Sequence, residues 1–121
     1  MSAVLSNGGH CSEIVDHCVH DHEPYTTTFI LEELKKVFRE KDFLFAENSL
    51  SGLLKFINQF YILGQTAGTV DNVCRDPNDD QILADALINQ VDVIITGDKD
   101  LLDMKSYKGI RILLPKDYWI L

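Results

Sequence analysis

The chain has 121 residues, of which 45% are hydrophobic and 25% are charged. This composition predicts one globular domain over residues 1–121 and excludes a disordered protein. The formal net charge of −8 argues against a protein that coats nucleic acid non-specifically, although divalent cations could still bring nucleic acid to an acidic site. No apolar run approaches the ~18–20 residues of a membrane span, and three cysteines without framework spacing favour the reducing cytoplasm.

The first third of the chain predicts a helix, a strand and a second helix. Residues 10–21 place apolar side chains on one side at helical spacing. Pro24 ends that segment, and the β-favouring YTTT (25–28) predicts a strand or a transition into a helix capped by Thr28. The helix that follows is FILEELKKVFREK (29–41). Its apolar stripe consists of Ile30, Leu34, Val37 and Phe38.

Helices and strands continue to alternate in the rest of the sequence. We expect helices over 47–59, from Pro77 through Leu87 and over 100–104, and strands over 60–65, 91–96 and 110–115. The segment VDVIIT (91–96) is a short continuous apolar run, which is typical of a strand covered on both faces. This alternation predicts an α/β layered sandwich with a mainly parallel sheet.

Four aspartates surround the start of one predicted helix, in RDPNDDQILADAL (75–87). Asp76, Asp79 and Asp80 precede its apolar residues, and Asp85 follows one and a half turns later. One interpretation is capping, with each acid in the first turn worth about 0.3–1 kcal/mol against the helix dipole. A single cap would be enough, however, and close carboxylates repel by roughly 1 kcal/mol per pair in water. A hard cation between them would remove that cost, so both interpretations stay open.

A second acidic cluster lies in ITGDKDLL (95–102). Asp98 and Asp100 follow the end of a buried strand, where open parallel sheets bind ligands. Asp98 could equally be the N-cap of the short helix that follows. One helix, a short turn and one strand separate Asp79 from Asp98, and a unit of that length could bring both to one edge of the sheet. The two clusters would then form a metal site.

The second predicted helix offers two adjacent glutamates. At about 100° per residue, Glu32 lies opposite the apolar stripe and faces Lys36, as in a solvent-exposed ion pair. Glu33 lies at the border of the stripe, beside Ile30 and Val37. A carboxylate there either extends to solvent or is aimed into a cleft, so Glu33 is the better ligand candidate.

The motifs ILEELKKVF, DPNDDQILADAL, VDVIITGDKDLL and RILLPKDYW, in this order, give the chain a resemblance to the PIN-domain family. It looks most like the VapC-type toxins of bacterial and archaeal toxin–antitoxin pairs, and the similarity covers about residues 2 to 118. ITGDKDLL alone is only moderately specific for the PIN-domain family, whereas the four motifs in this order and spacing are a strong indication of it. The resemblance implies a PIN-like three-layer sandwich with a mainly parallel sheet.

The resemblance also implies a metal-dependent endoribonuclease that hydrolyses RNA phosphodiesters through a Mg²⁺- or Mn²⁺-activated water. Glu33, Asp79 and Asp98 match the family's catalytic and metal-binding acids, and Asp80 and Asp100 stand beside those positions and could share the metal. Hard oxygen ligands suit both cations. An RNA substrate, an antitoxin protein, a homodimer or higher oligomer, no membrane and a cytoplasmic location follow from the same resemblance.

The start of the chain departs from the family pattern. Family members open with a strand ending in an aspartate, roughly LDTN, before a helix beginning SA. SAVLSNGG matches the part after that motif, so we expect the first central strand and its aspartate to be missing, which would leave an unpaired seam in the sheet. Met1 would then be an internal methionine of a longer reading frame, or the chain a natural truncation. The alternative function is a catalytically impaired PIN-fold module that binds an antitoxin or itself.

Three other interpretations are considered. Histidines and cysteines in HCSEIVDHCVHDH (10–22) suggest zinc, but the paired C-x₂-C spacing of structural zinc sites is missing, which favours a partly buried helix. A phospho-accepting receiver domain also gathers acids around Mg²⁺, yet Asp71 has no suitable setting for phosphorylation. Several basic residues either form a solvated face or guide RNA along the rim of the acidic pocket. They are Lys99, Lys105, Lys108 and Arg111.

Overall fold

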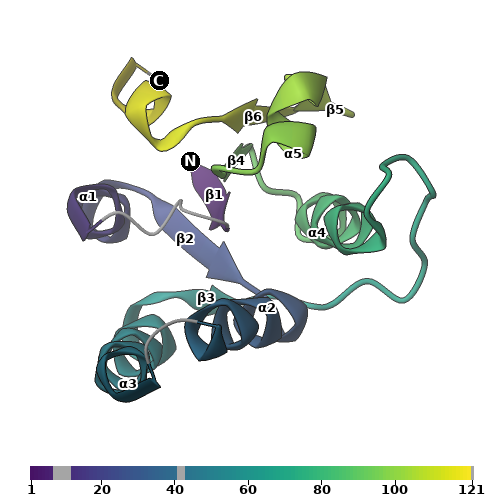
Figure 1. Ribbon diagram of the computed structural model, residues 1–121. Helices are drawn as coiled ribbons and strands as arrows, with labels where there is room; N and C mark the ends of the chain where they lie inside the picture. The colour runs from purple at the N-terminus through teal and green to yellow at the C-terminus, as the bar shows by residue number, and fades with distance from the viewer. Residues whose placement is uncertain (7–11, 41–42, 121) are drawn as a thin grey trace.

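A mainly parallel sheet forms the centre of the molecule. The computed structural model describes residues 1–6, 12–40 and 43–120, and within them it has a six-stranded sheet in the order β3-β2-β1-β4-β6-β5 (Figure 1). The strands are β1 (Ser2–Leu5), β2 (Glu23–Thr26), β3 (Ile62–Leu63), β4 (Val93–Ile95), β5 (Ser106–Tyr107) and β6 (Ile110–Leu113). Neighbouring strands run parallel except for β5 and β6, which are antiparallel. The predicted α/β fold with a mainly parallel sheet is confirmed.

Helices cover both faces of this sheet. They are α1 (Ser12–Asp21), α2 (Thr28–Arg39), α3 (Phe43–Phe60), α4 (Pro77–Ile88), α5 (Lys99–Met104) and the 3₁₀ helix η1 (Pro115–Ile120). In Figure 1, α1 and α3 lie to the left of the sheet, α4 and α5 lie to its right, and α2 contacts both α3 and α4. Within the described part of the chain, no helix has the length and apolar character needed to cross a membrane.

Alternation along the central strands divides the core between the two faces. Ala3 and Leu5 of β1 pack with α1 and α3, whereas Val4 packs with α2, α4 and α5. All three side chains are fully buried. Because successive residues of a strand point to opposite faces, a strand covered on both sides must be apolar at every position. This explains why residues 3–5 of β1 and all of β4 are continuous apolar runs.

The expectation that the first central strand is missing is wrong. β1 lies in the middle of the sheet, with Ala3 aligned with Pro24 of β2 on one side and with Val93 of β4 on the other. The sheet therefore has no unpaired seam at this position. With only four residues, SAVL is too short to show a periodicity, and its burial on both faces removes the polar alternation that would identify a strand. The residue directly after β1 is Ser6 and not a carboxylate.

Two boundaries in the β2–α2 region also differ from the sequence prediction. Pro24 lies inside β2 instead of ending the preceding segment. The hydroxyl of Thr27, and not that of Thr28, accepts a hydrogen bond from the backbone N–H of Ile30 at 3.3 Å, and Thr28 is the first residue of α2. The cap thus lies one residue earlier than predicted.

Asp85 on α4 is a structural aspartate that links three segments. It is fully buried, and its Oδ2 accepts a hydrogen bond from the Thr27 hydroxyl at 2.7 Å. Its Oδ1 accepts hydrogen bonds from the backbone N–H of Ala67 at 2.7 Å and the side-chain amide of Gln81 at 2.8 Å. These bonds hold the start of α2 and the segment between β3 and α4 against α4, so the buried carboxylate is well satisfied.

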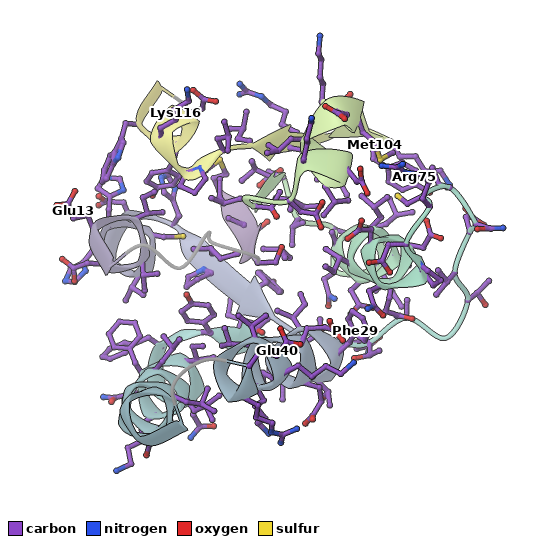
Figure 2. The ribbon with its side chains drawn as sticks, in the orientation of Figure 1. Glu13, Phe29, Glu40, Arg75, Met104 and Lys116 are labelled. Carbon is purple, nitrogen blue, oxygen red and sulfur yellow. The ribbon has the colours of Figure 1, made fainter. Side chains whose placement is uncertain are left out.

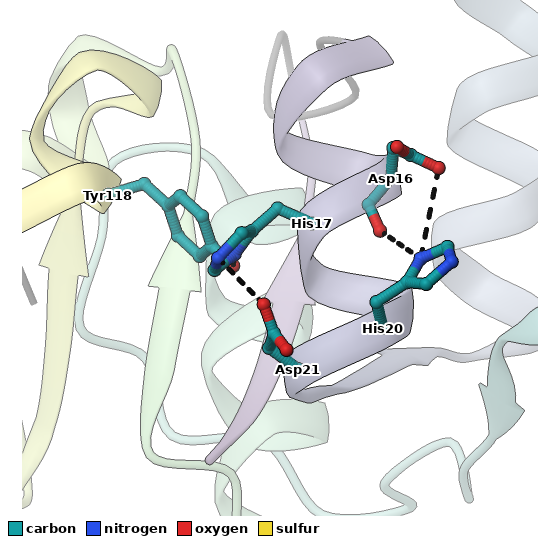
Figure 3. Close-up of polar contacts among 5 residues, drawn as sticks. All are labelled: Asp16, His17, His20, Asp21 and Tyr118. Carbon is teal, nitrogen blue, oxygen red and sulfur yellow. Dashed lines mark hydrogen bonds and ion pairs between the residues drawn. The ribbon is translucent and has the colours of Figure 1, made fainter.

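The C-terminal η1 packs against the end of α1. The hydroxyl of Tyr118 is 2.6 Å from Nδ1 of His17, and Nε2 of His17 is 2.8 Å from Asp21 (Figure 3). His20 points the other way, toward its own helix, with Nδ1 2.8 Å from the carbonyl of Asp16 (Figure 3). His17 and His20 therefore have structural partners, and none of the described histidines belongs to the candidate metal group found in the described residues. His10 and Cys11 of the zinc interpretation lie outside those residues.

Candidate metal centre

An acidic pocket lies at the carboxyl edge of the central strands. Ser6 follows β1 and Asp98 follows β4, and these two strands are direct neighbours in the sheet. α2 and the first turn of α4 supply the remaining walls. The polar residues that line the pocket are Ser6, Glu33, Asp76, Asn78, Asp79 and Asp98. This edge, where parallel strands end, is the place where open α/β sheets bind ligands.

The turn after β4 fixes the position of Asp98. The buried hydroxyl of Thr96 accepts a hydrogen bond from the backbone N–H of Asp98 at 3.1 Å. Asp98 is the N-cap of α5, and its Oδ1 accepts a hydrogen bond from the backbone N–H of Asp100 at 2.9 Å. The capping interpretation of Asp98 therefore describes its local role correctly. Capping occupies one oxygen position and leaves the carboxylate facing the pocket.

The first turn of α4 positions Asp79 in a similar way. Asp76 is the N-cap, its Oδ1 accepting a hydrogen bond from the backbone N–H of Asn78 at 2.9 Å, and Pro77 follows where its missing N–H costs nothing. The carbonyl of Asp76 accepts a hydrogen bond from the backbone N–H of Asp79 at 3.1 Å. One aspartate thus satisfies the helix end, and the side chain of Asp79 is left for the pocket, where it is only 2% exposed.

Three carboxylates from these two turns converge. Asp79, Asp98 and Asp100 each offer one oxygen, and the three oxygens lie within 4.8 Å of one another. Burial, a hydrogen bond to Asp98 and the negative charges around it raise the pKa of Asp79 from its ordinary 3.8 to about 7. The cluster therefore retains a proton under conditions in which an isolated aspartic acid would be fully ionised.

The residues of the pocket fit a divalent cation. Oδ2 of Asp79 is buried and has no hydrogen-bond partner among the described residues. An unpartnered carboxylate oxygen beside two further carboxylates is unfavourable for the protein alone, but it is what a hard cation requires. The donor set is all oxygen, which suits Mg²⁺ and Mn²⁺ and not the softer metals that prefer thiolates.

Glu33 lines the same pocket but stands apart from the three converging carboxylates. Its Oε1 is 3.5 Å from Nζ of Lys36, while Glu32 pairs with Lys35 at 3.3 Å. The predicted pairing of Glu32 with Lys36 is therefore wrong, because both glutamates pair at a spacing of three residues. The placement of Glu33 on the pocket wall, with Glu32 exposed outside it, agrees with their positions relative to the apolar stripe.

Asp80 is absent from the residues that line the pocket and from the three-carboxylate group among the described residues, so the structure gives no support to its predicted share in the metal. Its Oδ1 accepts hydrogen bonds from the backbone N–H groups of Val73 at 3.0 Å and Cys74 at 2.7 Å. Burial works against its ionisation, but these two N–H donors outweigh it and lower the pKa of Asp80. Adjacent residues on a helix point about 100° apart, so Asp80 faces the segment before α4 when Asp79 faces the pocket.

The positively charged side chain beside the three carboxylates is that of Arg75, which the sequence patterns did not single out. Nη2 of Arg75 is 2.7 Å from Oδ1 of Asp100, and Sγ of the adjacent Cys74 is 3.8 Å from Sδ of Met104 at the end of α5 (Figure 2 labels Arg75 and Met104). Of the two interpretations of Lys99, Lys105, Lys108 and Arg111, the rim has no support, because none of these residues lines the pocket in the described part of the chain. Lys108 instead pairs with Asp71 at 3.2 Å. The signal for Arg75 was its place directly before Asp76.

With this geometry, the comparisons with known proteins identify the family. A family model described as the PIN domain matches residues 1–100. The chain therefore belongs to the PIN-domain family. PIN domains are generally nucleases that use divalent metals, and the acidic group at the edge of the sheet could bind such a metal. The comparisons with curated proteins and with solved structures gave no match.

Proposed function

We propose that the chain is a Mg²⁺- or Mn²⁺-dependent endoribonuclease that hydrolyses RNA phosphodiesters. The observation that carries this proposal is the convergence of Asp79, Asp98 and Asp100, with their oxygens within 4.8 Å and Oδ2 of Asp79 buried without a partner. In this proposal Asp79 and Asp98 are the principal ligands, Asp100 shares the cation, and Glu33 adds a carboxylate from the α2 wall.

Each of these residues has a defined part in the reaction. A bound divalent cation supplies Lewis acidity, lowers the pKa of a bound water and stabilises charge on the phosphate. Asp79 must release its proton for the site to bind the cation at full strength, since its pKa is raised by its neighbours. The cap at the start of α5 keeps Asp98 in one orientation. Arg75 bonds Asp100 through an exposed guanidinium, which would contact an RNA phosphate that enters the site.

The biological part of the proposal is a toxin of a toxin–antitoxin pair, acting in the cytoplasm. The ordered motifs that resemble the VapC-type branch support it. A toxin of this kind would bind an antitoxin protein and form a homodimer or higher oligomer. Apolar side chains exposed at and next to the edge strand β3 offer surface for such contacts: Phe60, Ile62 and Leu63.

A second candidate function is a PIN-fold interaction module with impaired catalysis, which would bind an antitoxin or another copy of itself. The observation that favours it is Ser6, an uncharged residue at the carboxyl end of the central strand β1 and on the pocket wall. One carboxylate fewer would weaken cation binding and, with it, cleavage. This candidate predicts binding of a protein partner without RNA hydrolysis.

Digestion of a mixed RNA substrate tests the proposed activity directly. The purified protein should cleave RNA with Mn²⁺, stop when EDTA is added, and lose activity in Asp79→Asn or Asp98→Asn by about two orders of magnitude or more, because each change removes a charged ligand. Asp103→Asn is the matched control, since Asp103 is exposed on α5 and lies outside the three-carboxylate group. It should retain full activity.

Three results would contradict the proposed nuclease activity at this site. Cleavage that persists in EDTA, or that survives Asp79→Asn, would show that another site or a contaminant is responsible. Absence of cleavage by a folded protein that still binds a partner would favour the interaction module instead.

A further inference from the structure

Ser6 occupies a protected position on the wall of the acidic pocket. It follows β1 directly, and its backbone N–H donates a hydrogen bond to the carbonyl of Ile95 at 2.9 Å, which extends the pairing of β1 with β4 by one residue. The side chain is 4% exposed and lines the pocket together with Glu33, Asp79 and Asp98. Its backbone is therefore fixed by the sheet, and its hydroxyl is held at the same edge as the carboxylates.

The hydroxyl of Ser6 lacks an internal partner. Its Oγ is buried and forms no hydrogen bond with any described residue. A buried hydroxyl without a partner costs free energy, so a serine that merely filled this space would be less favourable than an alanine. Oδ2 of Asp79, in the same pocket, is in the same condition. Two buried oxygens without hydrogen-bond partners therefore line one cavity, which indicates that a bound group can interact with both.

We propose that the Ser6 hydroxyl is an uncharged oxygen ligand of the divalent cation that Asp79 and Asp98 bind; this inference rests on the proposed function and deepens it. A hydroxyl can donate a lone pair to a hard cation without adding negative charge to an already crowded cluster. The site then combines carboxylates with one neutral donor. Affinity for a hard cation rises with the number of charged ligands, so this choice yields a weaker site than a further carboxylate would.

Titration calorimetry of the full chain with Mn²⁺ alone tests the proposal. Ser6→Ala should weaken the affinity by about tenfold, since one ligand is lost, whereas Ser6→Asp should strengthen it by about tenfold or more, since a charged ligand replaces a neutral one. Ser106→Ala, on the exposed edge strand β5, is the matched control and should bind as the unmodified protein does.

Thermal unfolding in EDTA separates a ligand from a structural residue. If the hydroxyl has no internal partner, the metal-free Ser6→Ala protein should unfold at the same temperature as the unmodified one or slightly above it. Added Mn²⁺ should then raise its unfolding temperature by less. A clear loss of stability in the metal-free Ser6→Ala protein would show that the hydroxyl serves the fold, and would overturn the proposal.

Asp79→Asn distinguishes the failure of this inference from the failure of the proposed function. If Ser6→Ala binds Mn²⁺ with unchanged affinity while Asp79→Asn has lost binding, the metal site stands and Ser6 is not a ligand. If Asp79→Asn binds as tightly as the unmodified protein, the three-carboxylate site itself is wrong, and the role of Ser6 is refuted with it.

Discussion

A divalent cation bound in the acidic group would share the carboxylate of Asp100 with Arg75. The guanidinium lies 2.7 Å from Asp100 and its side chain is 87% exposed, so the ion pair is weak and can exchange with solvent or with another cation. Arg75→Gln should therefore increase the affinity for Mn²⁺ by about two- to fivefold, as measured by calorimetry. The same change should raise the KM for RNA, because the variant lacks the guanidinium that would contact a phosphate.

Lys108→Gln is the control for this prediction. Lys108 also pairs with an exposed aspartate, Asp71, but it does not line the pocket. The Lys108→Gln change should leave the affinity for Mn²⁺ and the KM for RNA unchanged. An unaltered Mn²⁺ affinity in Arg75→Gln would mean that the ion pair seen with Asp100 does not persist in solution.

The protonation of Asp79 should be visible in the stability of the metal-free protein. Burial and Asp98 raise the pKa of Asp79 from 3.8 to about 7. The contribution of Asp79 to the free energy of unfolding is therefore most favourable below about pH 4 and is lost as the pH rises through about 7. Asp79→Asn removes the charge that the fold disfavours. In EDTA at pH 8 this variant should therefore unfold with a free energy higher by about 1–3 kcal/mol.

Denaturant unfolding at two pH values checks this prediction. The difference between Asp79→Asn and the unmodified protein should become much smaller at pH 4, where the carboxyl group of the folded state is protonated and no longer carries the disfavoured charge. If the two proteins differ in free energy of unfolding by the same amount at pH 8 and pH 4, the effect has another cause, such as a changed helix cap on α4.

At the scale of elements, Asp85 joins α4 to the start of α2 and to the long connection that follows β3. Asp85→Ala would leave the buried donors of Thr27 and Ala67 without their acceptor. Unfolding in urea should show a loss of about 2–4 kcal/mol. Asp103→Ala, on an exposed part of α5, should change the stability by no more than about 0.5 kcal/mol. If Asp85→Ala and Asp103→Ala lose the same free energy of unfolding, Asp85 does not stabilise the fold by linking these elements.

The elements that the sequence predicted best are those with a periodic or long apolar pattern. The buried strand β4 and the helix after Pro77 were both placed correctly, because each has a distinct signal in a single segment. The strand β1 was missed because its identity depends on neighbours far along the chain, β2 and β4, and not on its own four residues. The two-residue strand β5 has even less signal, since it depends on pairing with β6.

The candidate site was predictable only in part for the same reason. That Asp79 and Asp98 belong to one edge of the sheet followed from the order of elements along the chain. Which of Asp79 and Asp80 faces the pocket depends on how α4 rotates when it packs, and local sequence does not contain that information. Ser6 could be recognised only once β1 was known to be central.

For the molecule as a whole, Ser6 and Asp98 follow the carboxyl ends of the neighbouring parallel strands β1 and β4, and the start of α4 brings Asp79 to the same pocket, so one sheet edge carries the proposed chemistry. This predicts a common response of the fold to metal. Saturating Mn²⁺ should raise the unfolding temperature, since a ligand that binds only the folded state stabilises it by about 2.7 kcal/mol at a hundred times its Kd. EDTA should reverse the gain, and Asp98→Asn should show none.

The direction of β1 also determines where the molecule can be tethered. Met1 accepts a hydrogen bond through its carbonyl from the backbone N–H of Glu23, and Ser2 donates one to Asp92 at 2.9 Å, so this end of the strand lies at the amino edge of the sheet. The full length of the strand separates that edge from Ser6. An affinity tag, a dye or a link to a sensor chip joined ahead of Met1 would therefore emerge away from the carboxylates and leave the acidic pocket accessible.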